Sequence, residues 1–227
     1  MSRERLVIAI DGPAGSGKST VAKALAKKLG YLYIDTGAMY RAVTLAGLRQ
    51  GIDFEDPHRI AEVAESSKIE LAPGEPQIKV MLDGENIENL IRTPEVSWLT
   101  SQKTANSPGV RERLVTRQRE LGAAGGVVME GRDIGTVVFP DADLKVYFQV
   151  SVEERTRRRI ADFEARGIPF DPDLVRQEIE KRDREDQGRP QGALKKARGA
   201  VDVLGDGKPV ETILSELVGL LPKDIGK

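Results

Sequence analysis

One segment near the start of the chain has the residue types and spacing of a phosphate-binding loop. Gly12–Ser19 reads GPAGSGKS, which fits G-x-x-x-x-G-K-[ST] and follows an apolar run that predicts a buried strand. Glycines let backbone N–H groups point inward, the next helix adds its positive end, and Lys18 can reach the outer phosphates. The strand before the loop disfavours the alternative, a glycine-rich turn that binds nothing. The predicted nucleotide-binding set is Gly12, Pro13, Ala14, Gly15, Ser16, Gly17, Lys18, Ser19 and Thr20, with Ser19 also holding magnesium.

The composition limits the partners of this chain. Its 227 residues favour one domain, 1–227, with an insertion, and 35 Lys plus Arg nearly balance 36 Asp plus Glu. That balance gives no general attraction to nucleic acid or to an anionic membrane. No cysteine is present, which excludes disulfides and thiolate metal sites. No apolar run is long enough for a signal peptide or a membrane span, so we expect a cytoplasmic protein that binds neither nucleic acid nor membrane.

Strand patterns alternate with helix patterns along most of the chain. This order predicts an α/β fold, in which helices cover both faces of a mostly parallel sheet. Cap signals indicate helix starts at Thr93-Pro94, Ser107-Pro108 and Asp171-Pro172, and Ser151 with Glu154 fits a capping box. Predicted strands are 6–10, 31–35, 127–130, 144–150 and 200–204; predicted helices are 17–29, 36–48, 57–67, 94 onward, 108–121, 152 onward, 172–184 and 210–220.

A different pattern interrupts this alternation at about residues 68–92. Two strand-like runs, 69–71 and 77–82, are separated by Ala72-Pro73-Gly74-Glu75-Pro76, and Asp83-Gly84 gives another turn signal. We predict a small antiparallel β insert.

Three polar clusters follow predicted strands or end a helix, where ligands of an α/β protein collect. They are 35–41 (DTGAMYR), 130–136 (EGRDIGT) and 182–189 (RDREDQGR). A phosphate loop alone indicates only a nucleoside triphosphate, so these clusters must identify the second substrate.

Taken in order, the loop, DTGAMYR, GRDIGTVVFPD (131–141) and RDxxDxxR (182–189) resemble the bacterial cytidylate kinases, which are P-loop nucleoside monophosphate kinases. The resemblance covers essentially the whole chain, including the insert, which is large in that family. It implies transfer of the γ-phosphoryl group of ATP to CMP or dCMP with Mg²⁺, and it suggests a monomer. The chain departs from the usual pattern at Thr36, often serine, and at Trp98, where smaller residues are common.

The resemblance also implies roles for individual residues. Arg41, Arg132 and Arg189 would hold the acceptor phosphate, a task that suits a guanidinium fork. Asp133 would accept a hydrogen bond from the exocyclic amine of cytosine. Ser101 would help Asp133, Arg111 would contact the base edge, and Arg182 and Asp186 would bind the sugar hydroxyls. The implied catalytic residues are Lys18, Arg132 and Arg189. The implied substrate-binding residues are Thr36, Tyr40, Arg41, Ser101, Arg111, Arg132, Asp133, Arg182, Asp186 and Arg189.

Several of these residues have an ordinary alternative. Asp133 could form a solvated ion pair with Arg132, and Arg182 and Asp186 have the i, i+4 spacing of a helix surface pair. The arginine cluster after residue 151 is either a solvated helix face or a lid, about residues 151–170, over the phosphates. Its members are Arg155, Arg157, Arg158 and Arg159.

The remaining distinctive side chains are expected to be structural. His58 should be an exposed surface residue, and Trp98 and Met129 should be core residues. Alternative functions are a related kinase for UMP or another acceptor, or a nucleotide-dependent switch or nucleic-acid remodeller. The absence of an N-K-x-D guanine-reading segment and of a long basic stripe disfavours that second class.

Overall fold

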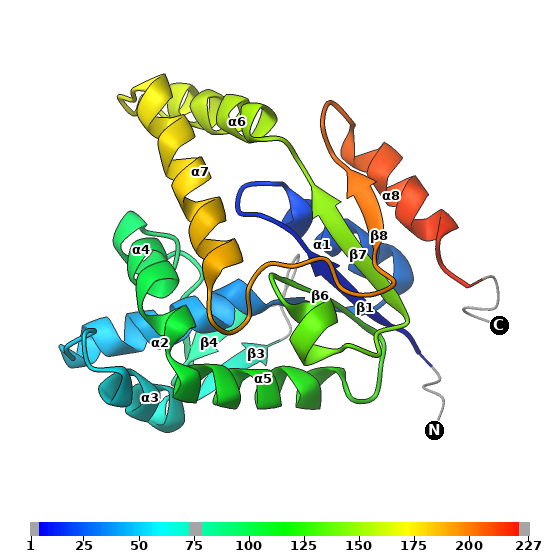
Figure 1. The fold of residues 1–227 in the computed structure, drawn as a ribbon. Helices are drawn as coiled ribbons and strands as arrows, with labels where there is room; N and C mark the ends of the chain where they lie inside the picture. Colours follow the sequence, from blue (N-terminus) through cyan, green and yellow to red (C-terminus); the bar gives the residue numbers. More distant parts are fainter. Residues whose placement is uncertain (1–4, 73–78, 223–227) are drawn as a thin grey trace. The chain divides into compact units, whose positions relative to one another are not determined.

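The computed structural model describes residues 5–72 and 79–222 (Figure 1). The chain divides into two compact units, residues 1–33 with 124–227 and residues 34–123. We call them the first and second unit and describe each by itself.

The first unit is built on a five-stranded sheet in the order β2 (Leu32–Asp35, of which residues 32–33 belong to this unit), β6 (Val127–Gly131), β1 (Val7–Asp11), β7 (Leu144–Gln149), β8 (Val201–Leu204). β1 pairs in parallel with both β6 and β7, and β7 with β8, so the carboxyl ends of these strands meet at one edge. Asp11 lies opposite Gly131 and Tyr147. The predicted parallel α/β architecture is confirmed.

The core of this unit lies between the sheet and two helices, α1 (Lys18–Leu29) and α8 (Val210–Gly219). Val21 and Leu25 of α1 and Leu217 of α8 pack against alternate residues of β1, β6, β7 and β8. The other face is buried as well: Val7, Ala9 and Met129 are inaccessible to solvent, which confirms the core position of Met129. A short π-helical turn, η2 (Ile134–Val138), lies beside β1 and β6 and was not predicted.

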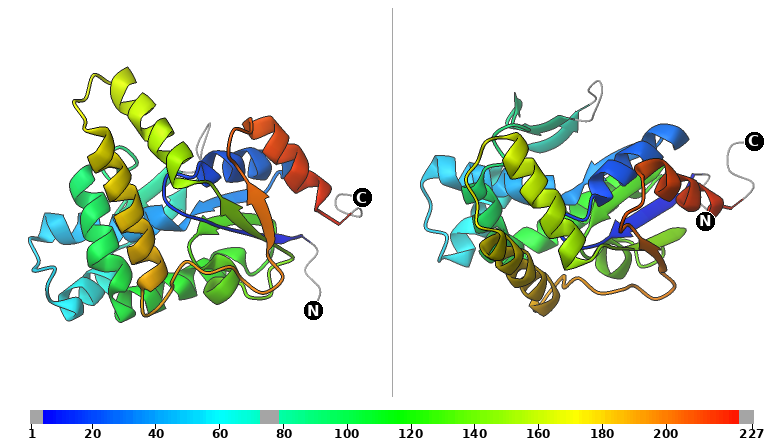
Figure 2. Two further views of the ribbon diagram at one scale, coloured as in Figure 1. Left: turned by 45° about the horizontal axis from the view of Figure 1, so that its top comes forward. Right: turned by 90° about the horizontal axis from the view of Figure 1, so that it is seen from above.

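Two further helices, α6 (Val152–Ala165) and α7 (Pro172–Gly188), pack side by side (Figure 2). The hydroxyl of Ser151 caps α6 by accepting the Glu154 N–H at 3.2 Å. The capping box is only half formed, because the Ser151 N–H donates to Asp206 instead. Asp171 caps α7, which continues to Gly188 and not to about Arg184, so the predicted end was four residues too early.

Within its described residues, the second unit contains four α-helices, one 3₁₀ turn and a small sheet. Its helical elements are α2 (Thr36–Gln50), α3 (Pro57–Ser66), α4 (Pro94–Gln102), the 3₁₀ turn η1 (Thr104–Asn106) and α5 (Pro108–Gly122). The sheet joins β3 (Ile69–Ala72), β4 (Lys79–Leu82) and β5 (Glu85–Asn86) in antiparallel pairs, as expected for the 68–92 segment. Residues 73–78, which contain most of the predicted turn, lie outside the described residues.

Two expectations for this unit were wrong. The Ser107 side chain does not cap α5, because its hydroxyl donates to the Pro57 carbonyl at 3.3 Å. Trp98 is 56% exposed on α4 and is not a core residue, since Val96 is the side chain that α4 buries nearby. His58 is exposed as expected.

Candidate active site

The phosphate loop joins the central strand β1 to α1, and two of its glycines are required by geometry. A Cβ on Gly12 would lie 2.5 Å from the Phe148 carbonyl oxygen of β7. Gly17 has a φ of 84°, a conformation that side chains other than glycine rarely adopt. The loop can therefore pass close to β7 and turn directly into the helix whose N-terminal end it presents.

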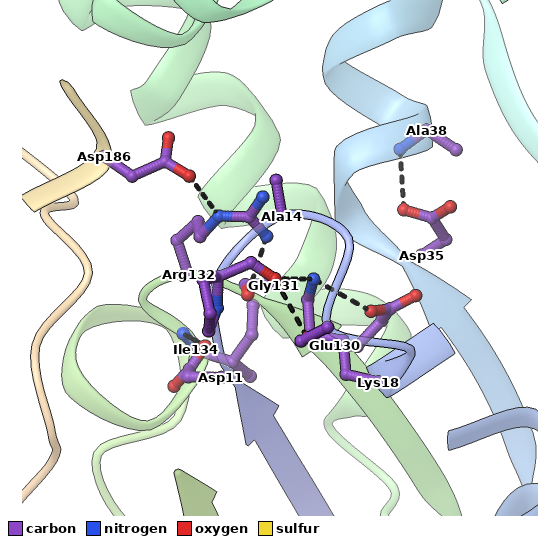
Figure 3. Close-up of polar contacts among 12 residues, drawn as sticks. Asp11, Ala14, Lys18, Asp35, Ala38, Glu130, Gly131, Arg132, Ile134 and Asp186 are labelled. Atoms are coloured by element: carbon purple, nitrogen blue, oxygen red, sulfur yellow. Dashed lines mark hydrogen bonds and ion pairs between the residues drawn. The ribbon is translucent and has the colours of Figure 1, made fainter. Parts of the chain in front are cut away.

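Lys18 is buried at the start of α1. Its ammonium donates to the Pro13 carbonyl at 3.2 Å and lies 3.7 Å from Glu130 Oε2, the contact that Figure 3 shows beneath the loop. Glu130 is itself buried at the end of β6 and accepts a hydrogen bond from the Tyr33 hydroxyl at 2.6 Å. Sequence reasoning placed Glu130 in a polar cluster but assigned no specific role to Glu130 or Tyr33, although an acid at the end of a buried strand was a usable signal. The Tyr33 hydrogen bond stabilises the carboxylate beside Lys18.

Asp11, the last residue of β1, is a second buried acid that sequence reasoning missed. It is 3% exposed, and its two carboxylate oxygens accept hydrogen bonds from the backbone N–H groups of Ile134 and Gly135, both at 2.8 Å. Figure 3 shows Asp11 beside Ile134. Burial raises the pKa of Asp11 to about 6, and the two backbone N–H groups offset part of that rise. The strand that leads into the phosphate loop is thereby tied to the segment that follows Asp133.

The end of α7 holds a third buried acid, Asp186, which is 1% exposed. Its carboxylate accepts a hydrogen bond from Arg132 Nε at 2.6 Å and forms an ion pair with Arg189 Nη2 at 2.7 Å. Burial acts to raise the pKa of Asp186, but the charges of Arg132, Arg189 and Arg182 outweigh it, so the pKa is lowered. Burial alone would lower the pKa of Arg132, but the negative charge of Asp186 outweighs it, so the pKa of Arg132 is raised. The structure brings together these four predicted residues.

The ordinary alternatives for these residues are not what the structure shows. Asp186 pairs with Arg132 and Arg189, so it is not the acid of a simple surface pair with Arg182. Asp133 is buried, and the Nε of Arg132 is directed at Asp186, so these two neighbours do not form a solvated ion pair.

The arginines of α6 differ from one another. Arg155 is 4% exposed and binds Asp183 through both terminal nitrogens, at 2.9 and 2.5 Å, so a solvated face is wrong for this residue. Its Nη1 also donates to the Ala14 carbonyl of the loop at 3.3 Å. Arg158 donates to the Ser16 carbonyl at 3.1 Å and to the Gly205 carbonyl at 2.9 Å. Two of the four arginines therefore hold the outside of the phosphate loop.

The other two arginines lie on the exposed side of α6. Arg157 has a side chain that is 70% exposed and binds Glu154, while Arg159 lies over the Phe163 ring at 4.5 Å. Hydrogen bonds from Arg157, and also from Arg158, lower the pKa of Glu154 to about 2. The repulsion within this dense arginine cluster is thus reduced by ion pairs with three acids, Glu154, Asp162 and Asp183.

The second unit holds the remaining predicted substrate residues. Arg111 of α5 is buried and donates to the Tyr40 hydroxyl at 3.4 Å. Arg41 pairs with Asp35 at 3.0 Å, and Asp35 also caps α2 by accepting the Ala38 N–H. Two further members of the predicted set, Thr36 at the start of α2 and Ser101 on α4, are buried.

A central parallel strand, a glycine loop and a buried lysine at the start of the next helix define this class of protein as a P-loop kinase-type α/β domain. The model of the cytidylate kinase family matches residues 8–223. The chain belongs to the cytidylate kinase family.

Individual relatives agree with this assignment. A cytidylate kinase from Geobacillus sp. (strain WCH70) is 44% identical over 224 residues, 99% of this chain and 100% of that protein. One from Pelotomaculum thermopropionicum is 49% identical over 212 residues, 93% of each chain. A bifunctional pantoate ligase/cytidylate kinase from Synechococcus elongatus is 48% identical over 95% of this chain, which corresponds to 42% of that protein. In the described part of the chain, no helix has the length and apolar character needed to span a membrane.

Proposed function

We propose that this protein transfers the γ-phosphoryl group of ATP to CMP or dCMP, giving ADP and CDP or dCDP. The observation that carries the proposal is the register of β1 with β6. Asp11 lies opposite Gly131, so the loop that follows β1 and the Arg132-Asp133 segment that follows β6 start at the same edge of the sheet. Donor and acceptor phosphates must meet for an in-line transfer, and this arrangement suits that requirement.

The donor half of the site is the phosphate loop. Phosphoryl transfer needs alignment and charge neutralisation more than covalent chemistry from the protein. Loop N–H groups and Lys18 bind the ATP phosphates in this proposal. Lys18 contacts Pro13 and Glu130 at 3.2 and 3.7 Å, distances that allow the ammonium to turn toward a phosphate with little rearrangement.

Magnesium fits this half of the site through Ser19. Its hydroxyl is in the first turn of α1, beside the buried Lys18, and makes no hydrogen bond within the described residues. Those residues contain no group of three or more His, Cys, Asp or Glu side chains suited to a metal ion. Mg²⁺ commonly takes few protein ligands and completes its shell with water and substrate phosphates. When bound, it neutralises charge on the β and γ phosphates of ATP.

The acceptor phosphate is assigned to three arginines. Asp186 orients Arg132 and Arg189, because one carboxylate accepts from one guanidinium at 2.6 Å and pairs with the other at 2.7 Å. Arg182 lies close enough to Asp186 to lower its pKa, and this pair is assigned to the sugar hydroxyls. In the second unit, Arg41 is the third phosphate ligand. The other acceptor-binding residues proposed there are Thr36, Tyr40, Ser101 and Arg111.

Asp133 is proposed to distinguish cytosine from uracil in the acceptor. A buried carboxylate can accept a hydrogen bond from the exocyclic amine of cytosine. Uracil has a carbonyl oxygen at the same position, which cannot donate this hydrogen bond. A site that requires such a hydrogen bond can discriminate by up to about 10⁴ to 10⁵ when the bond cannot form. Arg111, buried in the second unit, is proposed to contact the base edge.

A coupled assay of ADP release tests the function directly. It compares CMP, dCMP, UMP, AMP and no acceptor, and activity must be highest with CMP or dCMP. Asp133→Asn should lower CMP turnover sharply and narrow the CMP to UMP ratio, while Asp141→Asn, an exposed acid of the same segment, should leave the ratio unchanged. Equal losses with both substrates would show that Asp133 does not read the base. Faster turnover of UMP or AMP by the unmodified protein would refute the proposed substrate.

A lid formed by about residues 151–170 is proposed for the start of α6. The contacts of Arg155 and Arg158 with loop carbonyls support it, because they connect α6 to the phosphate-binding segment. Closure should slow backbone hydrogen exchange in this segment when ATP and CMP bind together. Equal exchange with and without the nucleotides would favour a static role for these arginines.

The family resemblance further supports a single kinase domain, 1–227, with the 68–92 sheet as an insert, acting as a monomer in the cytoplasm. Light scattering of the purified protein and fractionation of expressing cells measure these two properties.

A further inference from the structure

The carboxylate of Asp11 caps the N-terminus of η2, a role usually taken by the residue at the N-cap position, here Asp133. The first N–H groups of any helical segment lack partners within the helix, and an aspartate at the N-cap position usually accepts one of them. Asp133 occupies that position before η2, yet its side chain makes no capping hydrogen bond. Asp11 accepts the N–H groups of Ile134 and Gly135 instead, from 123 and 124 residues away in the sequence.

The strand pairing explains why such a support is needed. The ladder between β1 and β6 ends at the pair Asp11 and Gly131, so the backbone of Arg132 and Asp133 lies beyond it. The next fixed points are the carbonyl of Asp133, which accepts the Val137 N–H at 2.8 Å, and the two N–H groups bound by Asp11. Asp11 therefore fixes the backbone directly after Asp133 from the residue that directly precedes the phosphate loop.

We propose that Asp11 is a positioning residue, which caps the segment after Asp133 and thereby sets Arg132 and Asp133 in a fixed relation to the phosphate loop. The inference rests on the acceptor roles proposed above for Arg132 and Asp133. Asp11, and not Asp133, supplies the cap of this segment. Burying an acid against neutral donors is costly, in agreement with the raised pKa of Asp11.

The test compares Asp11→Asn with Asp143→Asn in steady-state kinetics. Asn keeps the shape but offers one oxygen and places an N–H donor against a backbone N–H. We expect kcat/KM for CMP to fall by about 10- to 100-fold, the effect of a small misplacement of a binding group, and the CMP to UMP ratio to narrow. KM for ATP should change by less than about twofold, because the loop keeps its own contacts with Arg155 and Arg158. Asp143→Asn is the matched control, since Asp143 accepts a backbone N–H of β1 at its other end, Val7, at 2.8 Å.

The outcomes separate this inference from the proposed function. Failure of the unmodified protein to use CMP would refute the function, whereas unchanged CMP kinetics in Asp11→Asn, or equal losses for ATP and CMP, would overturn only the role of Asp11. If the variant is too unstable to assay, NMR of the unmodified protein provides a second measurement. The amide protons of Ile134 and Gly135 should exchange slowly with solvent because Asp11 accepts both, and rapid exchange of both protons would overturn the proposal.

Discussion

The first unit buries its acids in two different ways. At the edge of the sheet, Asp11 and Glu130 accept hydrogen bonds from neutral donors, two backbone N–H groups and the Tyr33 hydroxyl, and the Lys18 ammonium remains 3.7 Å from Glu130. At the end of α7, Asp186 is in direct contact with two guanidinium groups. Both environments exclude water, yet the pKa of Asp11 is raised while that of Asp186 is lowered.

The difference shows that the charge of the partner, and not burial alone, determines how a buried acid behaves. The neutral N–H groups hold Asp11 in place but do not compensate its charge, whereas Glu130 lies within ion-pair distance of the Lys18 ammonium. Guanidinium partners compensate the charge, and the arginines become fixed in return. The sheet edge is thus suited to receiving phosphate charge, and the end of α7 to holding arginines in a defined orientation.

The largest effect should come from Lys18→Ala. Removing this cation leaves Glu130 with its hydrogen bond from Tyr33, so the circular dichroism spectrum should not change. Loss of one preorganised electrostatic contact should lower kcat on the order of a thousandfold. Lys27→Ala, at an exposed position in the last turn of the same helix, is the control and should retain full activity. Retention of more than about a tenth of the activity in Lys18→Ala would contradict the phosphate-loop assignment.

Asp186→Asn should lower the stability of the fold. The amide cannot neutralise Arg132 and Arg189, and breaking a buried ion pair typically lowers the free energy of unfolding by about 3 kcal/mol or more. Urea unfolding followed by circular dichroism measures this change. Glu180→Gln, which removes an exposed ion pair of α7 with Arg176, should hardly move the urea midpoint. Similar midpoints for both variants would mean that Asp186 is not compensated as the structure indicates.

The smallest effect is the pH dependence of stability, and its sign differs between the two acids. Because the pKa of Asp11 is raised from 3.8 to about 6, its contribution to stability is greatest below the unfolded value and is lost as pH rises through about 6. The contribution of Asp186, whose pKa is lowered, is present above 3.8 and is lost as pH falls through its folded value.

Urea unfolding of the unmodified protein and of Asp11→Asn isolates the first of these contributions. The stability of the unmodified protein relative to the variant should fall by about 2 kcal/mol between pH 4.5 and 7.5. A difference that stays constant would show that Asp11 titrates in its ordinary range, and one that grows with pH would show that its pKa is lowered.

Much of the fold could be predicted because its signals are local. Thr93-Pro94 and Asp171-Pro172 begin helices where they were expected, and the insert forms the expected antiparallel pairs. Helix ends were less predictable: α7 continues to Gly188 because no proline or αL glycine signal stops it at Arg184.

The parts that sequence reasoning missed depend on contacts between distant residues. Asp11 and Ile134 are 123 positions apart, and no local pattern relates them. Arg155 and Arg157 look equivalent in an arginine-rich run, but only Arg155 meets Asp183, a residue of another helix.

The two arginines that hold the outside of the phosphate loop have a consequence for the orientation of its peptide planes. A trans peptide carries its carbonyl oxygen and the next residue's N–H on opposite sides of one rigid plane. Arg155 binds the Ala14 carbonyl and Arg158 binds the Ser16 carbonyl, so the N–H groups of Gly15 and Gly17 are turned away from α6. Side chains that need not touch an anion can thus decide which way the anion-binding dipoles point.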